Sequence, residues 1–109
     1  MLTKLEDQIL LTILTLGEDA YGISIYQHLE KITGSKIAVG VIYFALDRLA
    51  TRGYLETFLG EPTAVRGGMR KKFYRLTRAG MKALEKSKKV NDKLWKSYSE
   101  PAFSTNGDK

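Results

Sequence analysis

The sequence predicts a mainly helical fold with one small β-hairpin, an α+β domain followed by a separate C-terminal helix. Three observations predict it. Apolar residues recur at helical spacing in three segments of the first half of the chain. Two strand-like runs, YLETFL at 54–59 and RKKFYRL at 70–76, then flank a loop rich in glycine. A last amphipathic segment begins after Thr77.

The first two helices are predicted from their ends. Thr3 and Glu6 form a T-x-x-E capping box that starts the first helix, and Gly17 is a natural stop. We expect Asp19 to cap the second helix and Gly34 to end it. Apolar residues at helical spacing predict the buried faces: Leu5, Ile9, Ile13 and Leu16 in the first helix, and Ile25, Leu29 and Ile32 in the second.

A third helix is predicted from about Gly40 to Arg52, stopped by Gly53. When it is projected at about 100° per residue, one side is apolar and faces the core: Ile42, Ala45, Leu46 and Leu49. Tyr43 and Arg48 flank that side, and Phe44, Asp47 and Thr51 lie opposite it. The outer side has no packing role within one domain, so we interpret it as a binding surface.

The hairpin concentrates positive charge. Residues 66–78, RGGMRKKFYRLTR, contain no acidic side chain and six basic ones: Arg66, Arg70, Lys71, Lys72, Arg75 and Arg78. Tyr74 and Leu76 are expected to point into the core, so the residues that alternate with them, and the loop, face outward. An ordinary solvated surface mixes its charge signs, so this one predicts a negatively charged partner.

The charge of the whole chain is segregated in the same way. The net charge is +6. Residues 1–35 carry two basic and five acidic side chains, a net charge of −3, and the remainder carries sixteen and seven, a net charge of +9. Solubility alone explains a positive total but not its segregation, which indicates a polyanionic partner for the C-terminal two-thirds.

Composition excludes several classes of protein. The absence of cysteine excludes disulfides, thiolate chemistry and cysteine-ligated zinc. The apolar runs are too short to cross a membrane, and the start, MLTKLEDQILLTIL, lacks the features of a signal peptide. We therefore expect a cytoplasmic protein without a membrane partner.

Thr77 is expected to cap a last helix that runs to about Tyr98 and is stopped by Pro101. One side of it is rich in lysine. The other side carries Ala83, Ser87, Val90 and Leu94 at the 4-3-4 spacing typical of helix pairing. A stripe of this length is most simply covered by a second copy of the chain.

Three helices followed by a hairpin describe a winged helix-turn-helix, with the second and third helices as the helix-turn-helix and the basic loop as the wing. We therefore divide the chain into a DNA-binding domain (1–76), a dimerisation helix (77–100) and a flexible tail (101–109). The third helix fits the major groove, and the wing cations can pair with phosphates. The predicted DNA contacts are Lys36, Tyr43, Phe44, Asp47, Arg48, Arg66, Gly67, Gly68, Arg70, Lys71 and Lys72.

Several of these residues keep a second interpretation. Tyr43 reaches a phosphate or is a half-buried packing residue. Arg48 contacts a phosphate, a guanine edge or an acid in its own helix. Phe44 contacts a thymine methyl group, the hairpin or a partner chain.

The segments AYGISIYQHLE (20–30), VGVIYFALDRLATRGYLE (39–56) and RKKFYRLTRAG (70–80), together with ILLTIL, resemble the PadR family of bacterial transcriptional regulators. The resemblance covers roughly residues 5–85. It implies a winged-helix dimer that binds operator DNA, usually as a repressor, with dimer contacts from the first and last helices. The predicted interface comprises Leu5, Ile9, Leu84, Ser87, Val90, Asn91, Leu94, Trp95 and Tyr98.

The sequence departs from the family pattern at two surfaces expected near DNA. The family often has threonine or alanine where Val41 stands, and proline where Phe44 stands. The wing, with its run at 67–69, also departs from the common G-x-P-R-K-Y pattern. The operator sequence therefore does not carry over from the family.

Trp95 has three interpretations: an anchor of the dimer core, the wall of a ligand pocket or an exposed residue. Some PadR-like regulators bind aromatic or drug-like compounds between subunits. The resemblance therefore implies a small aromatic effector that binds at Trp95 and relieves repression.

The leading hypothesis is thus a sequence-specific DNA-binding repressor that acts as a homodimer on a two-fold symmetric operator. The alternative is a winged-helix protein-interaction module without sequence-specific DNA binding, and the acid-free wing is evidence against it. An enzyme is the least favoured class, since the sequence shows no nucleophile-base pair, metal-ligand cluster or phosphate-binding glycine motif. We expect no cofactor and no metal, and a surface or packing role for His28.

Overall fold

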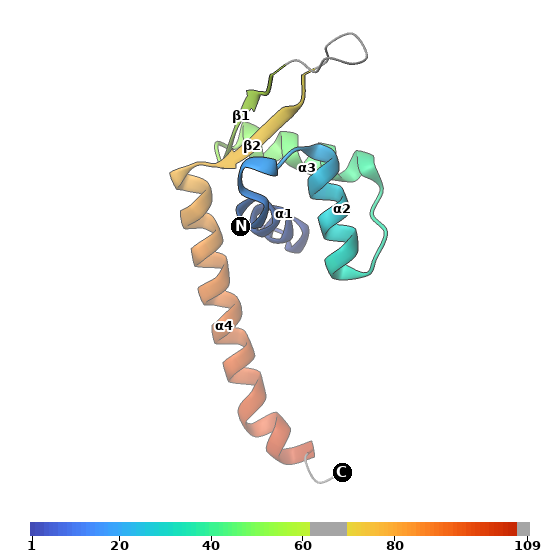
Figure 1. Cartoon of the computed structure of the whole chain (residues 1–109). Helices are drawn as coiled ribbons and strands as arrows, with labels where there is room; N and C mark the ends of the chain where they lie inside the picture. The colour runs from blue at the N-terminus through green and yellow to red at the C-terminus, as the bar shows by residue number, and fades with distance from the viewer. Residues whose placement is uncertain (62–69, 107–109) are drawn as a thin grey trace.

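The computed structural model describes the backbone of residues 1–61 and 70–106, and the side chains of these ranges as far as Tyr98. Two antiparallel strands and four α-helices make up the described chain, which confirms the mainly helical class with one hairpin (Figure 1). The elements are α1 (Lys4–Leu16), a 3-10 turn (Gly17–Asp19), α2 (Gly22–Thr33), α3 (Val39–Thr51), β1 (Leu55–Leu59), β2 (Lys72–Leu76) and α4 (Arg78–Asn106).

Local signals set most of the helix ends. The capping box of α1 is present: the Thr3 N–H donates to Glu6 Oε1 at 2.9 Å, and the Glu6 N–H donates to Thr3 Oγ1 at 3.1 Å. Gly17 ends α1 with a φ of 60°, and Gly34 ends α2 with a φ of 72°. Both glycines adopt backbone conformations that other residues reach at a cost, so these two predicted ends are confirmed.

The predicted Asp19 cap is wrong. The chain makes a 3-10 turn at 17–19 and then an extended step, and α2 begins at Gly22 with Tyr21 as its N-cap residue. The cause is a contact with the hairpin: the Tyr74 N–H donates to the Ala20 carbonyl at 2.9 Å, and Tyr21 forms a β-bridge with Phe73. This isolated bridge and hydrogen bond hold the chain extended where a helix would otherwise start.

The core lies between α1, α2, α3 and the inner face of the hairpin. The predicted apolar side of α3 is confirmed, since its four residues are all buried: Ile42, Ala45, Leu46 and Leu49. Ile9, Ile25 and Leu29 are buried with them. Ile32 departs from the prediction, because it lies in the last turn of α2 and remains 66% exposed.

The hairpin has one face toward the core and one toward solvent. Leu55 pairs with Leu76 and Phe58 pairs with Phe73 in an antiparallel register. Tyr74 is buried and Leu76 is half-buried, as their predicted inward direction requires. Since side chains alternate along a strand, Phe58, Phe73 and Arg75 share the opposite, outer face.

The last helix begins as predicted but ends later. The Gly80 N–H donates to Thr77 Oγ1 at 3.0 Å, which caps α4. A Cβ atom at Gly80 would collide with the Tyr54 carbonyl, so the first turn of α4 approaches the chain before β1 closely enough to require glycine. Figure 1 shows α4 projecting from the rest of the molecule and curving at its far end.

The expected stop at Pro101 is wrong, because α4 continues to Asn106 and the expected tail at 101–109 is helical as far as that residue. A proline inside a helix removes one backbone hydrogen bond and bends the helix without having to end it. Within the described residues, no helix has both the length and the apolar character that a membrane crossing requires.

Candidate DNA interface

The outer side of α3 is exposed and carries large side chains. Phe44 is 63% exposed, and Val41, Asp47 and Arg48 are exposed beside it. The Arg48 guanidinium lies 5.8 Å from the centre of the Phe44 ring, one helical turn away. Most of the surface of Phe44 is therefore accessible to solvent. An apolar ring and a cation on one exposed helix face are suited to contacting bases.

Tyr43 lies at the edge of this face, where it is packed on one side and partly exposed on the other. Its ring packs directly against the backbone of Gly22 at the start of α2, where a Cβ atom would collide with it. It also remains 39% exposed, at the boundary between the two helices. The contact fixes how α2 and α3 meet, and it holds the tyrosine at the edge of the exposed surface.

Asp47 adds a negative charge to the same helix. Burial raises the pKa of the Tyr74 phenol, and the charge of Asp47 and the neighbouring Tyr43 raise it further. Asp47 therefore lies close enough to the inner face of β2 to influence Tyr74. An exposed carboxylate on this face can accept a hydrogen bond from a cytosine amino group.

The base of the wing carries the described part of the basic run. Arg70, Lys71 and Lys72 are all exposed. Arg75 is different, because its Nε lies 2.8 Å from Glu56 Oε2 across the hairpin. The predicted contacts Arg66, Gly67 and Gly68 lie outside the described residues. Lys36 is exposed in the connection that precedes α3.

An aromatic cluster on the outer face contacts one of these cations, Lys71. Phe73 stacks against Phe58 with ring centres 5.8 Å apart, and Tyr21 meets it edge-on at 5.5 Å. The Lys71 ammonium lies 4.2 Å from the centre of the Tyr21 ring. Tyr21 was not among the predicted site residues, although it lies in the segment 20–30 that carries part of the family resemblance.

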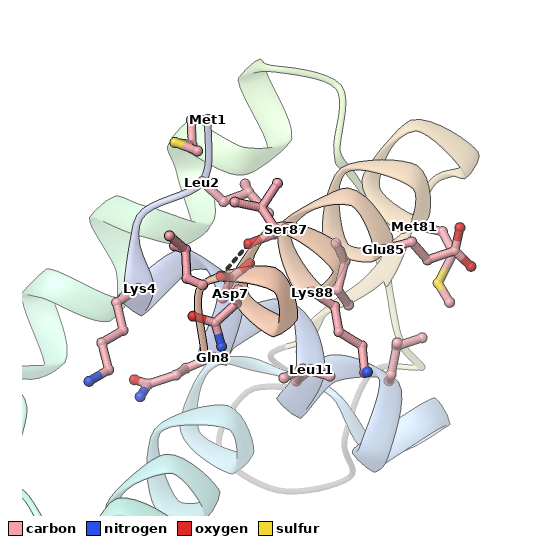
Figure 2. A pocket seen from close by; sticks show the side chains of 15 residues that line it. Met1, Leu2, Lys4, Asp7, Gln8, Leu11, Met81, Glu85, Ser87 and Lys88 are labelled. Carbon is pink, nitrogen blue, oxygen red and sulfur yellow. Dashed lines mark hydrogen bonds between the residues drawn. The ribbon is translucent and has the colours of Figure 1, made fainter. Parts of the chain in front are cut away.

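A groove runs between α1 and α4, with a volume of about 670 Å³. Figure 2 shows Asp7 and Ser87 meeting in it, where Ser87 Oγ donates to Asp7 Oδ2 at 2.6 Å. Among the described residues, nothing donates to Asp7 Oδ1, which is buried. The apolar lining consists of Met1, Leu2, Leu11, Leu14, Met81, Leu84, Val90 and Leu94.

The groove contains most of the predicted interface residues of α4. Ser87, Val90, Asn91 and Leu94 all line it, as does Leu84, which is buried against the chain's own core. Ile9 is a correction: it is fully buried inside the core, because it lies on the side of α1 that faces α2 and α3, and it has no surface to offer a partner. Leu5 is half-buried and packs against the core.

The far part of α4 carries exposed aromatic residues. Trp95 is 63% exposed and meets Tyr98 edge-on, with ring centres 6.1 Å apart. Together with Asn91 and Leu94 they line a shallow hollow of about 450 Å³. Among the residues that the structure describes, no three acidic or histidine side chains gather where they could hold a metal ion. His28 is half-buried on α2.

Solved structures of similar fold are regulators from several bacteria. A PadR-like transcriptional regulator from Bacillus cereus is 26% identical, with a TM-score of 0.71 and 87% of each chain covered. A transcriptional regulator from Clostridium thermocellum is 24% identical, with a TM-score of 0.71, and the match covers 93% of this chain and 98% of that one.

A third similar structure is Bacillus subtilis PadR in complex with operator DNA. It is 23% identical with a TM-score of 0.66, and the match covers 77% of this chain and 46% of that one. No curated protein matched the chain. The model of the transcriptional regulator PadR-like family matches residues 10–86, which include α2, α3, the hairpin and the start of α4. The chain therefore belongs to the PadR-like family of transcriptional regulators.

Proposed function

We propose that this regulator is a sequence-specific DNA-binding repressor that acts as a homodimer on a two-fold symmetric operator in the cytoplasm. The observation that carries the proposal is the exposed side of α3, where Phe44 and Arg48 lie together beside a cationic wing base. Neither side chain packs in the core, so both are free of packing contacts there and can contact a ligand. The fold shared with a PadR that was solved on operator DNA also supports it.

In the proposed complex α3 lies in the major groove. Arg48 contacts a guanine edge, and Phe44 contacts a thymine methyl group. Tyr43, whose ring packs against Gly22, donates a hydrogen bond to a phosphate. Arg70, Lys71 and Lys72 neutralise phosphates of the flanking backbone, and each neutralised phosphate releases condensed counterions. Affinity then depends on salt, while sequence preference depends on α3.

The dimer is proposed from the groove between α1 and α4. Part of its apolar lining is exposed to solvent, including Leu11 and Leu14 on α1 and Leu94, which is 62% exposed, on α4. A second copy of the same surface would cover it with matching apolar residues. Two copies would present two α3 helices to one side of a duplex, and this requires an operator with two-fold symmetry.

An aromatic effector is proposed for the surface around Trp95. The indole and Tyr98 present ring faces and edges on a helix that also contributes to the proposed dimer interface. A flat aromatic compound that stacks there would change how two α4 helices pack, and hence the spacing of the two α3 helices. Binding would then relieve repression.

Selection of duplexes from a random pool tests the sequence-specific part directly. We expect an enriched motif with two-fold symmetry, and the enriched site placed over a promoter should make transcription in vitro fall as protein is added. A pool without any enriched motif would contradict sequence-specific binding. A protein that raised transcription from the site would contradict the repressor assignment.

A further inference from the structure

One contact between the base of the wing and the start of α2 joins a cation to an aromatic ring. Lys71 precedes β2, and its ammonium lies 4.2 Å from the centre of the Tyr21 ring. Tyr21 is not part of the wing, because it precedes α2 by one residue. A cation over an aromatic face at this distance is attracted by the ring without losing its charge. The contact therefore orients the lysine and leaves it able to bind an anion.

The ring of Tyr21 is held firmly enough to act as a support. Its backbone N–H donates to Ser24 Oγ at 3.0 Å, and the single hydroxyl hydrogen of Ser24 is shared between the Asp19 carbonyl at 2.5 Å and the Tyr21 carbonyl at 2.9 Å. Its backbone bridges to Phe73, and its ring meets the Phe73 ring at 5.5 Å and an angle of 67°. Both the backbone and the side chain are thus fixed against β2.

The position of the ring links the two candidate DNA-contacting elements. The ring of Tyr43 from α3 packs against Gly22, the residue after Tyr21. Lys71 from the wing base and Tyr43 from α3 therefore contact two neighbouring residues, Tyr21 and Gly22, at the start of α2.

We propose that Tyr21 is a positioning residue that holds Lys71 in place for a phosphate of the DNA backbone. This inference rests on the proposed DNA-binding function. A lysine side chain has many rotamers, and restricting them before binding reduces the entropy lost on binding. One cation–π contact at an exposed site corresponds to a change of about two- to fivefold in affinity.

A double-mutant cycle on the full chain measures this coupling. The variants are Tyr21→Leu, Lys71→Met and the two combined, each titrated with one duplex of random sequence at a fixed low salt concentration. We expect Tyr21→Leu to weaken binding about two- to fivefold in the wild-type background and to have no further effect in the Lys71→Met background. Tyr21→Phe keeps the ring and should bind like the wild type.

Lys72 provides the matched control. It is the next residue, is exposed, and pairs with Leu59 on the other face of the hairpin. Tyr21→Leu should reduce the affinity for the duplex by the same factor in the wild-type background and in the Lys72→Met background. If Tyr21→Leu does not fold, the ring current reports the contact in the wild type: the Lys71 methylene protons should resonate upfield. Ordinary lysine shifts in the folded wild type would overturn the proposal.

The outcomes also separate this inference from the proposed function. Equal losses from Tyr21→Leu with and without Lys71 mean that the ring is only structural, and this overturns the inference. A Tyr21→Phe variant as weak as Tyr21→Leu overturns it as well. A wild-type chain that does not bind the duplex at all contradicts the proposed function, and the role of Tyr21 is overturned with it.

Discussion

The ring of Tyr43 on α3 packs against the backbone of Gly22 on α2 so closely that only glycine fits there. At this point of the helix-turn-helix, the aromatic ring of Tyr43 therefore contacts the glycine backbone of α2 directly. This close approach contributes to how the two helices pack, together with their buried apolar residues.

Gly22→Ala should lower the free energy of unfolding by about 1–3 kcal/mol, because the added methyl group overlaps the Tyr43 ring. Denaturant unfolding followed by circular dichroism measures it. Gly40→Ala is the control: the same change on α3 meets open space, and alanine favours a helix by about 1 kcal/mol. Equal midpoints for the two variants would contradict the packing of Tyr43 on Gly22.

Arg52→Met should destabilise the fold by about 1–3 kcal/mol, since it leaves the carboxylate of Glu6 without its counter-charge. The two side chains approach to 3.4 Å, and that of Glu6 is only 5% exposed. Arg75→Met is a closely matched control. Arg52 and Arg75 each pair with a glutamate and lie over an aromatic ring, but the side chain of Glu56 is 51% exposed.

The control should cost no more than about 1 kcal/mol, because exposed ion pairs contribute little. Thermal and denaturant unfolding of the two variants under the same conditions give the comparison. A larger loss from Arg75→Met than from Arg52→Met would show that burial of the carboxylate does not decide the contribution.

The sequence predicted those elements whose signals are local. The capping box at Thr3, the glycines that end α1 and α2, and the Thr77 cap each act within a few residues, and all are present. The apolar side of α3 was also predicted, because helical periodicity alone determines which residues share a face.

The errors have non-local causes. Asp19 does not cap α2, because the hairpin holds residues 20 and 21 extended through contacts about fifty residues away in the chain. Ile9 was assigned to the dimer interface because the family resemblance implies dimer contacts from the first helix without saying which side of it makes them, whereas its helical spacing had placed it on the buried face, where it lies. Tyr21 was missed for a related reason: its role depends on Lys71 and Phe73, which only the fold brings to it.

Val90→Asp combined with Leu94→Asp should convert the proposed dimer to monomers, with a dissociation constant raised at least about a hundredfold. Both changes place a carboxylate where we propose apolar contact. Sedimentation velocity measures the outcome. Lys89→Asp combined with Lys93→Asp alters the charge more, but on the polar side of α4, and should leave the dimer intact. A persistent dimer in the first variant would show that this stripe is not the interface.

Arg70→Ala should weaken binding to a similar degree on every DNA sequence and reduce the salt slope by about 0.9, as expected for a phosphate contact. Arg48→Ala or Phe44→Ala should instead change the preferred sequence, with a loss of about 1–3 kcal/mol on the preferred site and less on others. Selection from random pools with each variant makes the comparison. A uniform loss from all three changes would remove α3 from base recognition.

The most direct test of the central claim is the salt dependence of binding to double-stranded DNA. If the three described wing cations of each protomer neutralise phosphates, the logarithm of the association constant should fall with the logarithm of salt concentration at a slope of about −3 for one protomer and about −5 for a dimer. Fluorescence anisotropy of a labelled duplex gives this slope. A flat response, or no binding in dilute salt, would contradict DNA binding through the wing and α3.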